Sequence, residues 1–306
     1  MMRFWLGAFL MYCSLGFAQI PRDSSFTSYS ELQKVRRKFP DAELVQPISS
    51  DLYKVVENRL YSTIGKRKLY LDPYLNQSIK KKPAVILIHG GGWKSGDKEM
   101  MKPLAAAIAA HGYHCFAVEY RLSGEAQYPA AMEDVVNAIS FIKANAEEFN
   151  IDSGKMAVLG TSSGGQMASL IGTKYPHLIS AVINIDGILA FHHPQSEEGA
   201  AAAAWLGGTF DEKPDVWKDA SPLEHVNGKS VPVLFISSQH ERFQAGRADM
   251  VKLLNRYSIY SQSQIIKNSP HTFWMFKLWF EPVLNYVTGF LGQQLGQQNI
   301  NQLNKK

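Results

Sequence analysis

The stretch MAVLGTSSGGQMASLIGTK, residues 156–174, decides the fold. It opens on four apolar residues of strand type, and from 165 to 174 apolar side chains recur every three or four positions, as in an amphipathic helix. Between them lies Gly160-Thr161-Ser162-Ser163-Gly164, the G-x-S-x-G pattern of a sharp strand-to-helix turn. Such a turn exposes the central hydroxyl and directs the first amides of the helix toward it. We expect a nucleophile elbow with Ser162 at its tip; the alternative is an ordinary glycine-rich connection.

The same alternation extends along the chain. Apolar runs at 84–88, 115–118, 181–185, 233–236 and 264–266 are separated by helical patterns at 102–110, 130–148 and 245–257. This order predicts an α/β fold with a mostly parallel central sheet and helices on both faces. Two strands at 53–60 and 68–71, around a turn at Gly65, suit an antiparallel edge. Residues 189–223 break the rhythm, and we expect a small insertion there that covers the strand ends as a lid.

Composition and the two ends of the sequence indicate the class of protein and its division into segments. Of 306 residues, 45% are hydrophobic and 19% charged, which indicates a globular chain, and a net charge of +5 gives no reason to expect nucleic-acid binding. Residues 1–18 resemble a cleaved signal peptide: the apolar run 4–15 is shorter than the roughly 20 residues that a membrane anchor needs. We expect an extension at 19–50, the α/β domain at 51–295, a polar tail at 296–306, and a periplasmic or secreted protein with no stable membrane anchor. Only Cys115 would then remain, so we expect no internal disulfide.

A second glycine-rich segment, His89-Gly90-Gly91-Gly92-Trp93, follows the run 84–88. Three consecutive glycines let backbone amides approach a ligand oxygen closely, so this segment is expected to bind a developing oxyanion. The expected donors are the amides of Gly91, Gly92 and Ser163, and His89 is expected to brace the loop. A phosphate-binding loop is the alternative, but the Lys-Ser or Lys-Thr pair of such loops does not follow.

The base and the acid must lie after Ser162 in the order nucleophile, acid, histidine. His271 follows the last expected strand and fits as the base. The acid stays open between Asp186, which ends the run 181–185, and Glu241, beyond the run 233–236; Asp249 is a third candidate. Three other histidines are further candidates for residues that line the site: His192, His193 and His240. A zinc hydrolase is the rival, but a helical His-Glu-x-x-His pattern and a cysteine pair are both lacking, so neither metal nor cofactor is expected.

With these residues in view, the chain resembles the α/β-hydrolase carboxylesterases that carry a His-Gly-Gly-Gly loop, and more closely secreted bacterial carbohydrate esterases such as acetylxylan, feruloyl and pectin esterases. The similarity covers roughly residues 52–291 and is most specific at 89–93, 160–164, 184–187 and 270–274. It implies the α/β-hydrolase fold and deacylation of sugar polymers, without choosing between acetyl, methyl and feruloyl esters. Relatives with a similar 242–247 segment do not require an acid at position 241, which favours Asp186.

The expected function is therefore a serine esterase that forms an acyl-enzyme on Ser162 and acts on a polysaccharide or oligosaccharide ester, with pectin and xylan as examples. Trp93, Trp205, Phe273 and Trp274 are expected to stack on sugar rings, although core packing explains each equally well. Arg242 and Arg247 are expected to hold a uronate carboxylate, with helix capping or pairing with Asp249 as the alternative. A non-catalytic glycan-binding protein and a serine peptidase of the same fold remain alternative functions.

Overall fold

The computed structural model describes residues 23–296. The expected signal peptide and all but the first residue of the expected polar tail lie outside this range. Within it, every helix is too short or too polar to cross a membrane.

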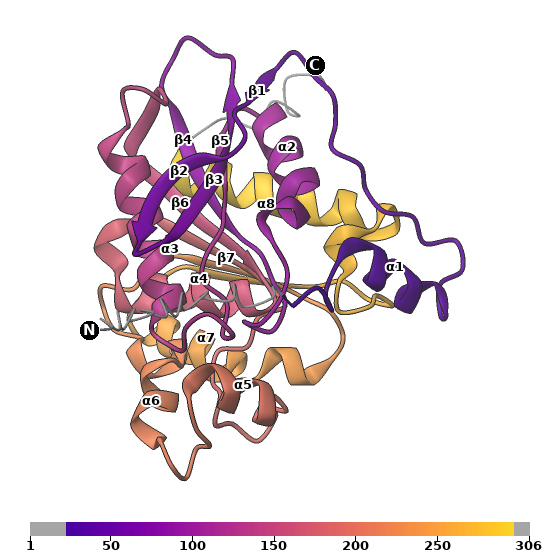
Figure 1. Cartoon of the computed structure of the whole chain (residues 1–306), viewed down its shortest axis with the longest axis vertical. Helices are drawn as coiled ribbons and strands as arrows, with labels where there is room; N and C mark the ends of the chain where they lie inside the picture. The colour runs from indigo at the N-terminus through magenta and orange to yellow at the C-terminus, as the bar shows by residue number, and fades with distance from the viewer. Residues whose placement is uncertain (1–22, 297–306) are drawn as a thin grey trace, which may run out of the picture.

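A nine-stranded sheet organises the molecule (Figure 1). Its strands run in the order β1-β3-β5-β4-β6-β7-β8-β9, and β2 pairs with β3. From β5 to β9 the neighbours are parallel, whereas the pairs that β3 makes with β1, β2 and β5 are antiparallel. This confirms the expected mostly parallel sheet with an antiparallel edge. The strands are β1 (Tyr53–Val55), β2 (Arg59–Ile64), β3 (Arg67–Asn76), β4 (Lys82–Ile88), β5 (His114–Val118), β6 (Ile151–Thr161), β7 (Ala181–Ile185), β8 (Val233–Ser237) and β9 (Ser261–Ile265).

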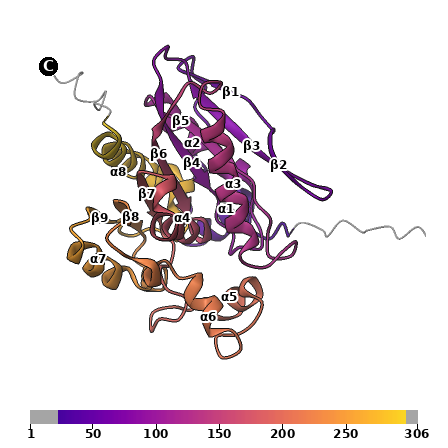
Figure 2. The ribbon, with the colours of Figure 1, turned by 90° about the vertical axis from the view of Figure 1, so that its left-hand side faces the viewer.

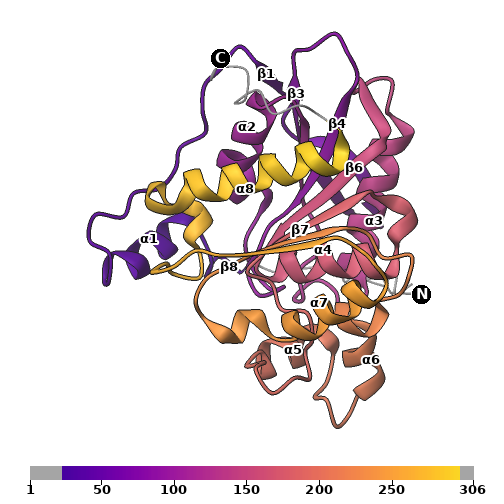
Figure 3. The same ribbon diagram turned by 180° about the vertical axis from the view of Figure 1, so that it is seen from behind.

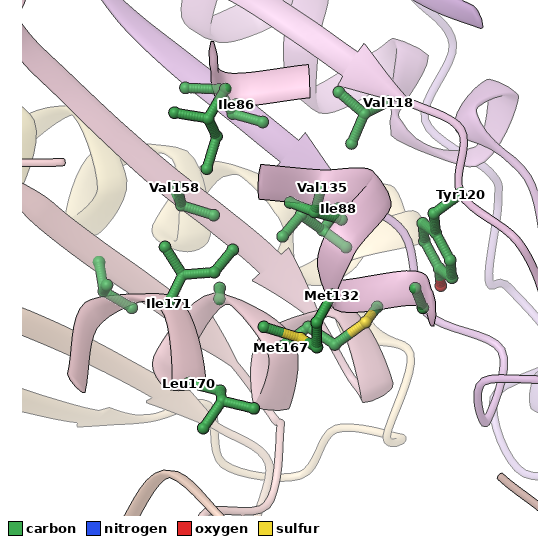
Figure 4. Packing of buried hydrophobic residues seen from close by; sticks show 14 of the residues in the cluster. Ile86, Ile88, Val118, Tyr120, Met132, Val135, Val158, Met167, Leu170 and Ile171 are labelled. Carbon is green, nitrogen blue, oxygen red and sulfur yellow. The ribbon is translucent and has the colours of Figure 1, made fainter. Parts of the chain in front are cut away.

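Helices cover both faces of the sheet, because alternate residues of each central strand point to opposite sides. Ile86 and Ile88 of β4 belong to one core cluster with α3 (Ala130–Ala144) and α4 (Ser163–Lys174), and α7 (Arg247–Arg256) contributes to the same cluster. Figure 4 shows Ile86 and Ile88 among side chains from α3 and α4, including Val135 and Ile171. Val85 and Leu87 instead meet α2 (Lys102–Ala110) and α8 (Lys277–Leu295). Figure 3 shows α8 crossing that face.

Two expected elements end earlier than the sequence pattern indicates. The strand expected at 53–60 breaks after β1, because Asn58 takes a left-handed φ of 58° and its amide donates to the buried Asp72 carboxylate at 2.7 Å. The helix expected to reach residue 148 stops at Ala144, where the Asn145 side chain donates to the Phe141 carbonyl at 2.8 Å. Both breaks depend on side-chain hydrogen bonds that compete with the regular backbone pattern.

The described part of the segment expected as an N-terminal extension packs against the α/β domain. It forms α1 (Ser28–Arg36), and Val35 and Ala42 are buried in the cluster that includes α8. The ring of Phe39 lies edge-on to Trp279 of α8 with centroids 4.9 Å apart. Burial of these apolar side chains means that this segment stabilises the face covered by α8.

The expected insertion lies between β7 and β8. It carries two short helices, α5 (Gly199–Leu206) and α6 (Pro214–Asp219). Figures 1 and 2 show both helices together at one end of the molecule. Trp205 of α5 is fully buried and stacks on Trp93, which follows β4, at a centroid distance of 5.0 Å. The insertion is thus anchored to the loop that follows a central strand.

Candidate active site

The turn between β6 and α4 places Ser162 in a strained backbone conformation, with φ 53° and ψ −123°. The two glycines of this turn are required because a side chain at either position would clash with the backbone. A Cβ on Gly160 would lie 1.9 Å from the Gly164 carbonyl oxygen, and one on Gly164 would lie 2.2 Å from the Ile88 carbonyl oxygen. Strain of this kind persists only where the surrounding structure enforces it, and it is found mainly at functional sites. The turn has the geometry expected of a nucleophile elbow.

The structure joins Ser162, His271 and Asp186 in one hydrogen-bonded chain. Nε2 of His271 lies 2.8 Å from Ser162 Oγ, and Nδ1 lies 2.7 Å from Asp186 Oδ2. An ionised carboxylate only accepts hydrogen bonds, so Nδ1 carries the proton and Nε2 is left to accept from the Ser162 hydroxyl. The arrangement is that of a serine nucleophile beside an oriented base.

Adjacent strand ends bring these groups together. The Ser162 amide donates to the Ile185 carbonyl at the end of β7, and the Asp186 amide donates to the Ile236 carbonyl of β8, both at 2.8 Å. Asp186 itself has a left-handed φ of 54°. Its buried carboxylate accepts from the Ser238 amide at 2.9 Å and from the Ser238 hydroxyl at 2.7 Å, in addition to His271. These donors fix the orientation of the Asp186 carboxylate toward His271.

The loop after β4 lies against the elbow. A Cβ on Gly90 would come within 2.9 Å of Ser162 Cβ, so only glycine at this position lets the loop lie this close to Ser162. The His89 ring stacks on Tyr120, and its Nδ1 lies 2.8 Å from the Gly90 carbonyl, which fits the bracing role expected for it. Gly91 shapes the loop, since its carbonyl accepts from the Ser95 amide at 3.1 Å and from the Ser95 hydroxyl at 3.0 Å.

A small cavity that is open to solvent lies beside Ser162. Of the three expected oxyanion donors, Gly92 and Ser163 line it, whereas the residues around it do not include Gly91. Ser163 is the first residue of α4, so its amide has no partner within the helix and the positive end of the helix dipole points here. The lining residues are Gly92, Trp93, Ser162, Ser163, Asp186, Ile188, Glu198 and Phe243.

Other candidates from the sequence lie elsewhere. Glu241 is exposed in the short turn η4 (Glu241–Gln244), and its carboxylate makes no hydrogen bond to His271; Asp249 is exposed on α7 and pairs with His193 at 3.2 Å. His192 stacks on Phe210, and His240 lies edge-on to Phe243. None of these three histidines lines the cavity formed by the described residues. No cluster of metal-ligating side chains is found in the described part of the chain.

The two expected carboxylate-binding arginines are already paired or buried. Arg242 donates to Glu197 at 3.2 Å and to Glu198 at 2.9 Å. Arg247 donates to the Ser237 hydroxyl at 2.9 Å and to Gln244. Burial lowers the pKa of the Arg247 guanidinium, and the charge of Asp186 partly opposes that shift. Arg247 is thus hydrogen-bonded to Ser237, the residue before Ser238. Both guanidinium groups are thus bound to acceptors of the protein itself, and the uronate site expected between them stays a prediction.

The expected sugar-stacking aromatics are almost wholly buried. Trp205 and Phe273 are completely inaccessible, which favours the core-packing alternative for both. Trp93 is among the residues that line the cavity, and its Nε1 donates to Gln166 at 2.9 Å. Trp274 lies edge-on to His271 at 5.5 Å but lines a second cavity, together with residues of the N-terminal segment.

Three residues at the site were missed from the sequence. Ser238 holds Asp186, Phe243 stacks flat on the His271 ring at 3.5 Å, and Glu198 lines the cavity. Phe243 is partly exposed. Ser238 and Phe243 follow β8, where a search of every strand end would have found them. Glu198 lies in the insertion, and no sequence signal marks it.

Comparison with known proteins places this geometry in a family. The BD-FAE family profile matches residues 71–244, more than half of the chain. The chain belongs to the BD-FAE family. Among curated proteins, esterase LipC of Mycobacterium tuberculosis is 28% identical over 192 residues, 56% of this chain and 48% of that protein. Versiconal hemiacetal acetate esterase of Dothistroma septosporum is 36% identical over 168 residues, 55% and 48% of the two chains. This BD-FAE chain thus spans about half the length of these curated relatives.

Solved structures give the fold of this BD-FAE member. A truncated form of a carbohydrate esterase from gut microbiota has a TM-score of 0.68 at 20% identity, covering 82% of this chain and 100% of that one. A thermostable esterase from Pseudomonas putida has a TM-score of 0.67 at 18% identity, covering 89% and 91%. These likenesses confirm the α/β-hydrolase fold.

Proposed function

We propose that the protein is a serine carboxylesterase, with Ser162 as nucleophile, His271 as general base and Asp186 as the acid that orients it. The observation that carries this proposal is the hydrogen-bonded chain of 2.8 and 2.7 Å through the two nitrogens of His271. Family membership and the esterases among the relatives support the same activity.

In the proposed mechanism, Ser162 Oγ attacks the ester carbonyl carbon while its proton moves to His271 Nε2. The amides of Gly92 and Ser163 donate to the negative oxygen of the tetrahedral intermediate. His271 then returns the proton to the leaving alcohol oxygen as the C–O bond breaks, which leaves an acyl-enzyme. Water attacks this ester with His271 again as base, and the carboxylic acid leaves with Ser162 restored.

For the substrate, we propose a carbohydrate ester, with acetyl, methyl or feruloyl esters of cell-wall polysaccharides such as pectin or xylan as the class to test. One structural neighbour is named as a carbohydrate esterase, which supports this choice. Export through the segment 1–18 would bring the enzyme to such polymers, and N-terminal sequencing of the mature protein tests cleavage after Ala18.

The deciding experiment compares purified protein with Ser162→Ala on 4-nitrophenyl acetate, on pectin and on acetylated xylan, and labels both with a fluorophosphonate. We expect acetate or methanol release and labelling by the native protein only. Binding of a polymer with neither labelling nor release would replace the proposal by a glycan-binding function. Faster cleavage of an aminoacyl anilide than of the aryl acetate would replace it by a peptidase.

A further inference from the structure

A second carboxylate shares the cavity with the proposed catalytic residues. Glu198 stands at the start of α5 and lines the cavity together with Ser162 and Ser163. Its side chain is only 12% exposed. A carboxylate so far removed from water is retained only when other groups satisfy it.

Arg242 satisfies just one of its oxygens. Nη2 of Arg242 donates to Oε1 of Glu198 at 2.9 Å, and among the described residues no donor is in hydrogen-bonding range of Oε2. Arg242 also donates to Glu197, so two carboxylates share one guanidinium and the group keeps a net negative charge. The wall of the cavity at this point therefore offers an acceptor oxygen beside Arg242, whose single positive charge is shared between two carboxylates.

The cavity holds a second polar group without a partner. The hydroxyl of Ser163 is buried and makes no hydrogen bond within the described chain. A hydroxyl can both donate and accept, whereas an ionised carboxylate only accepts. Ser163 and Glu198 together suit a ligand whose own hydroxyl groups donate and accept, as those of a sugar do.

We propose that Glu198 is a specificity-determining residue that accepts a hydrogen bond from a free hydroxyl of the sugar whose ester Ser162 attacks. This rests on the proposed function and narrows it to O-acylated neutral sugars. A hydrogen bond to a charged acceptor is stronger than one between neutral groups. A uronate carboxylate near Glu198 and Asp186 would meet like charges inside a partly buried site, so acylated uronic acids are disfavoured.

The test compares kcat/KM on acetylated xylo-oligosaccharide, acetylated galacturonate oligosaccharide and 4-nitrophenyl acetate, whose alcohol carries no hydroxyl beyond the esterified one. The native protein should prefer the xylo-oligosaccharide to the galacturonate. In Glu198→Gln, which keeps the size of the side chain, the ratio of kcat/KM for xylo-oligosaccharide to that for the aryl acetate should fall about tenfold, because the amide oxygen still accepts a hydrogen bond but carries no charge.

Glu197→Gln is the matched control. It removes the other carboxylate bound to Arg242, but its side chain is 66% exposed and lies outside the cavity lining. We expect its substrate ratio to stay at the native value. An equal change of ratio in both variants, an unchanged ratio in Glu198→Gln, or a native preference for the galacturonate ester would each overturn the inference. A native protein that hydrolyses none of the three substrates would instead overturn the proposed function.

Discussion

The Ser238 hydroxyl donates to Asp186 Oδ2 at 2.7 Å, and the same oxygen accepts from His271 Nδ1. Ser238 also donates its amide to the other carboxylate oxygen. The loop after β8 therefore holds a carboxylate that is supplied by the end of β7. Such a second layer of hydrogen bonds fixes the direction in which the carboxylate meets the imidazole.

Ser238→Ala removes one of these donors without touching the nucleophile. We expect kcat for an aryl acetate to fall by about tenfold with little change in KM, because a hydrogen bond to a charged group is lost and Asp186 is less well oriented. Ser221→Ala is a suitable control, since it removes a buried hydroxyl with bonds of 2.8 and 3.0 Å in the insertion. An equal loss of kcat in both variants would show a general effect of destabilisation.

Asp186→Asn tests the choice of acid. Asparagine tolerates the left-handed φ of 54°, so the fold should be retained. The side-chain NH₂ group of asparagine can donate to Nδ1 of His271, which favours the tautomer with the proton on Nε2. We therefore expect kcat to drop on the order of 10³- to 10⁴-fold. Glu241→Gln should leave kcat within about twofold, because substitutions at exposed positions away from a site usually have small effects. The prediction is wrong if steady-state kinetics on an aryl acetate give the reverse order.

The sequence predicts the sheet and its covering helices well, because the long apolar runs and helical periods are local signals. Ser162 and His271 could be singled out for the same reason, since one stands in a turn pattern and the other follows the last strand. The acid could not be identified from the sequence, because Asp186 and Glu241 satisfy the same chain order. Only the backbone conformation at Asp186 turns its carboxylate toward His271. Glu198 and the pairing of Arg242 depend on how the insertion folds back, which no local pattern specifies.

The two glycines of the loop after β4 should respond differently to alanine. A Cβ on Gly91 would lie 2.1 Å from the Ser95 carbonyl oxygen, whereas one on Gly92 meets no atom within 4 Å at a φ of +59°. Gly92→Ala should thus fold at a cost of about 1 to 2 kcal/mol for the left-handed backbone. Gly91→Ala must displace the loop, and its kcat should fall about a hundredfold further. Thermal unfolding and kcat measured on both variants check this; equal losses would mean that the space around each glycine does not decide the outcome.

The buried His114 should make the free energy of unfolding depend on pH. The side chain is 1% exposed; its Nδ1 accepts from the Asn76 amide at 3.0 Å, and Nε2 donates to the Asn150 carbonyl at 3.1 Å. Only the neutral ring satisfies both bonds, because a proton on Nδ1 would face the Asn76 N–H group. Burial lowers the pKa of His114 from 6.5 to about 4. The unfolded chain therefore binds this proton at a higher pH than the folded chain does.

It follows that the contribution of His114 to the free energy of unfolding is complete above about pH 6.5 and declines as the pH falls toward 4. At pH 4.5 the decline amounts to about 2 to 3 kcal/mol. His114→Gln does not titrate, so urea unfolding at pH 7.5 and 4.5 should give a smaller difference for it than for the native protein. His177→Gln replaces an exposed histidine and serves as the control. Parallel pH curves for all three proteins would mean that His114 carries none of this pH dependence.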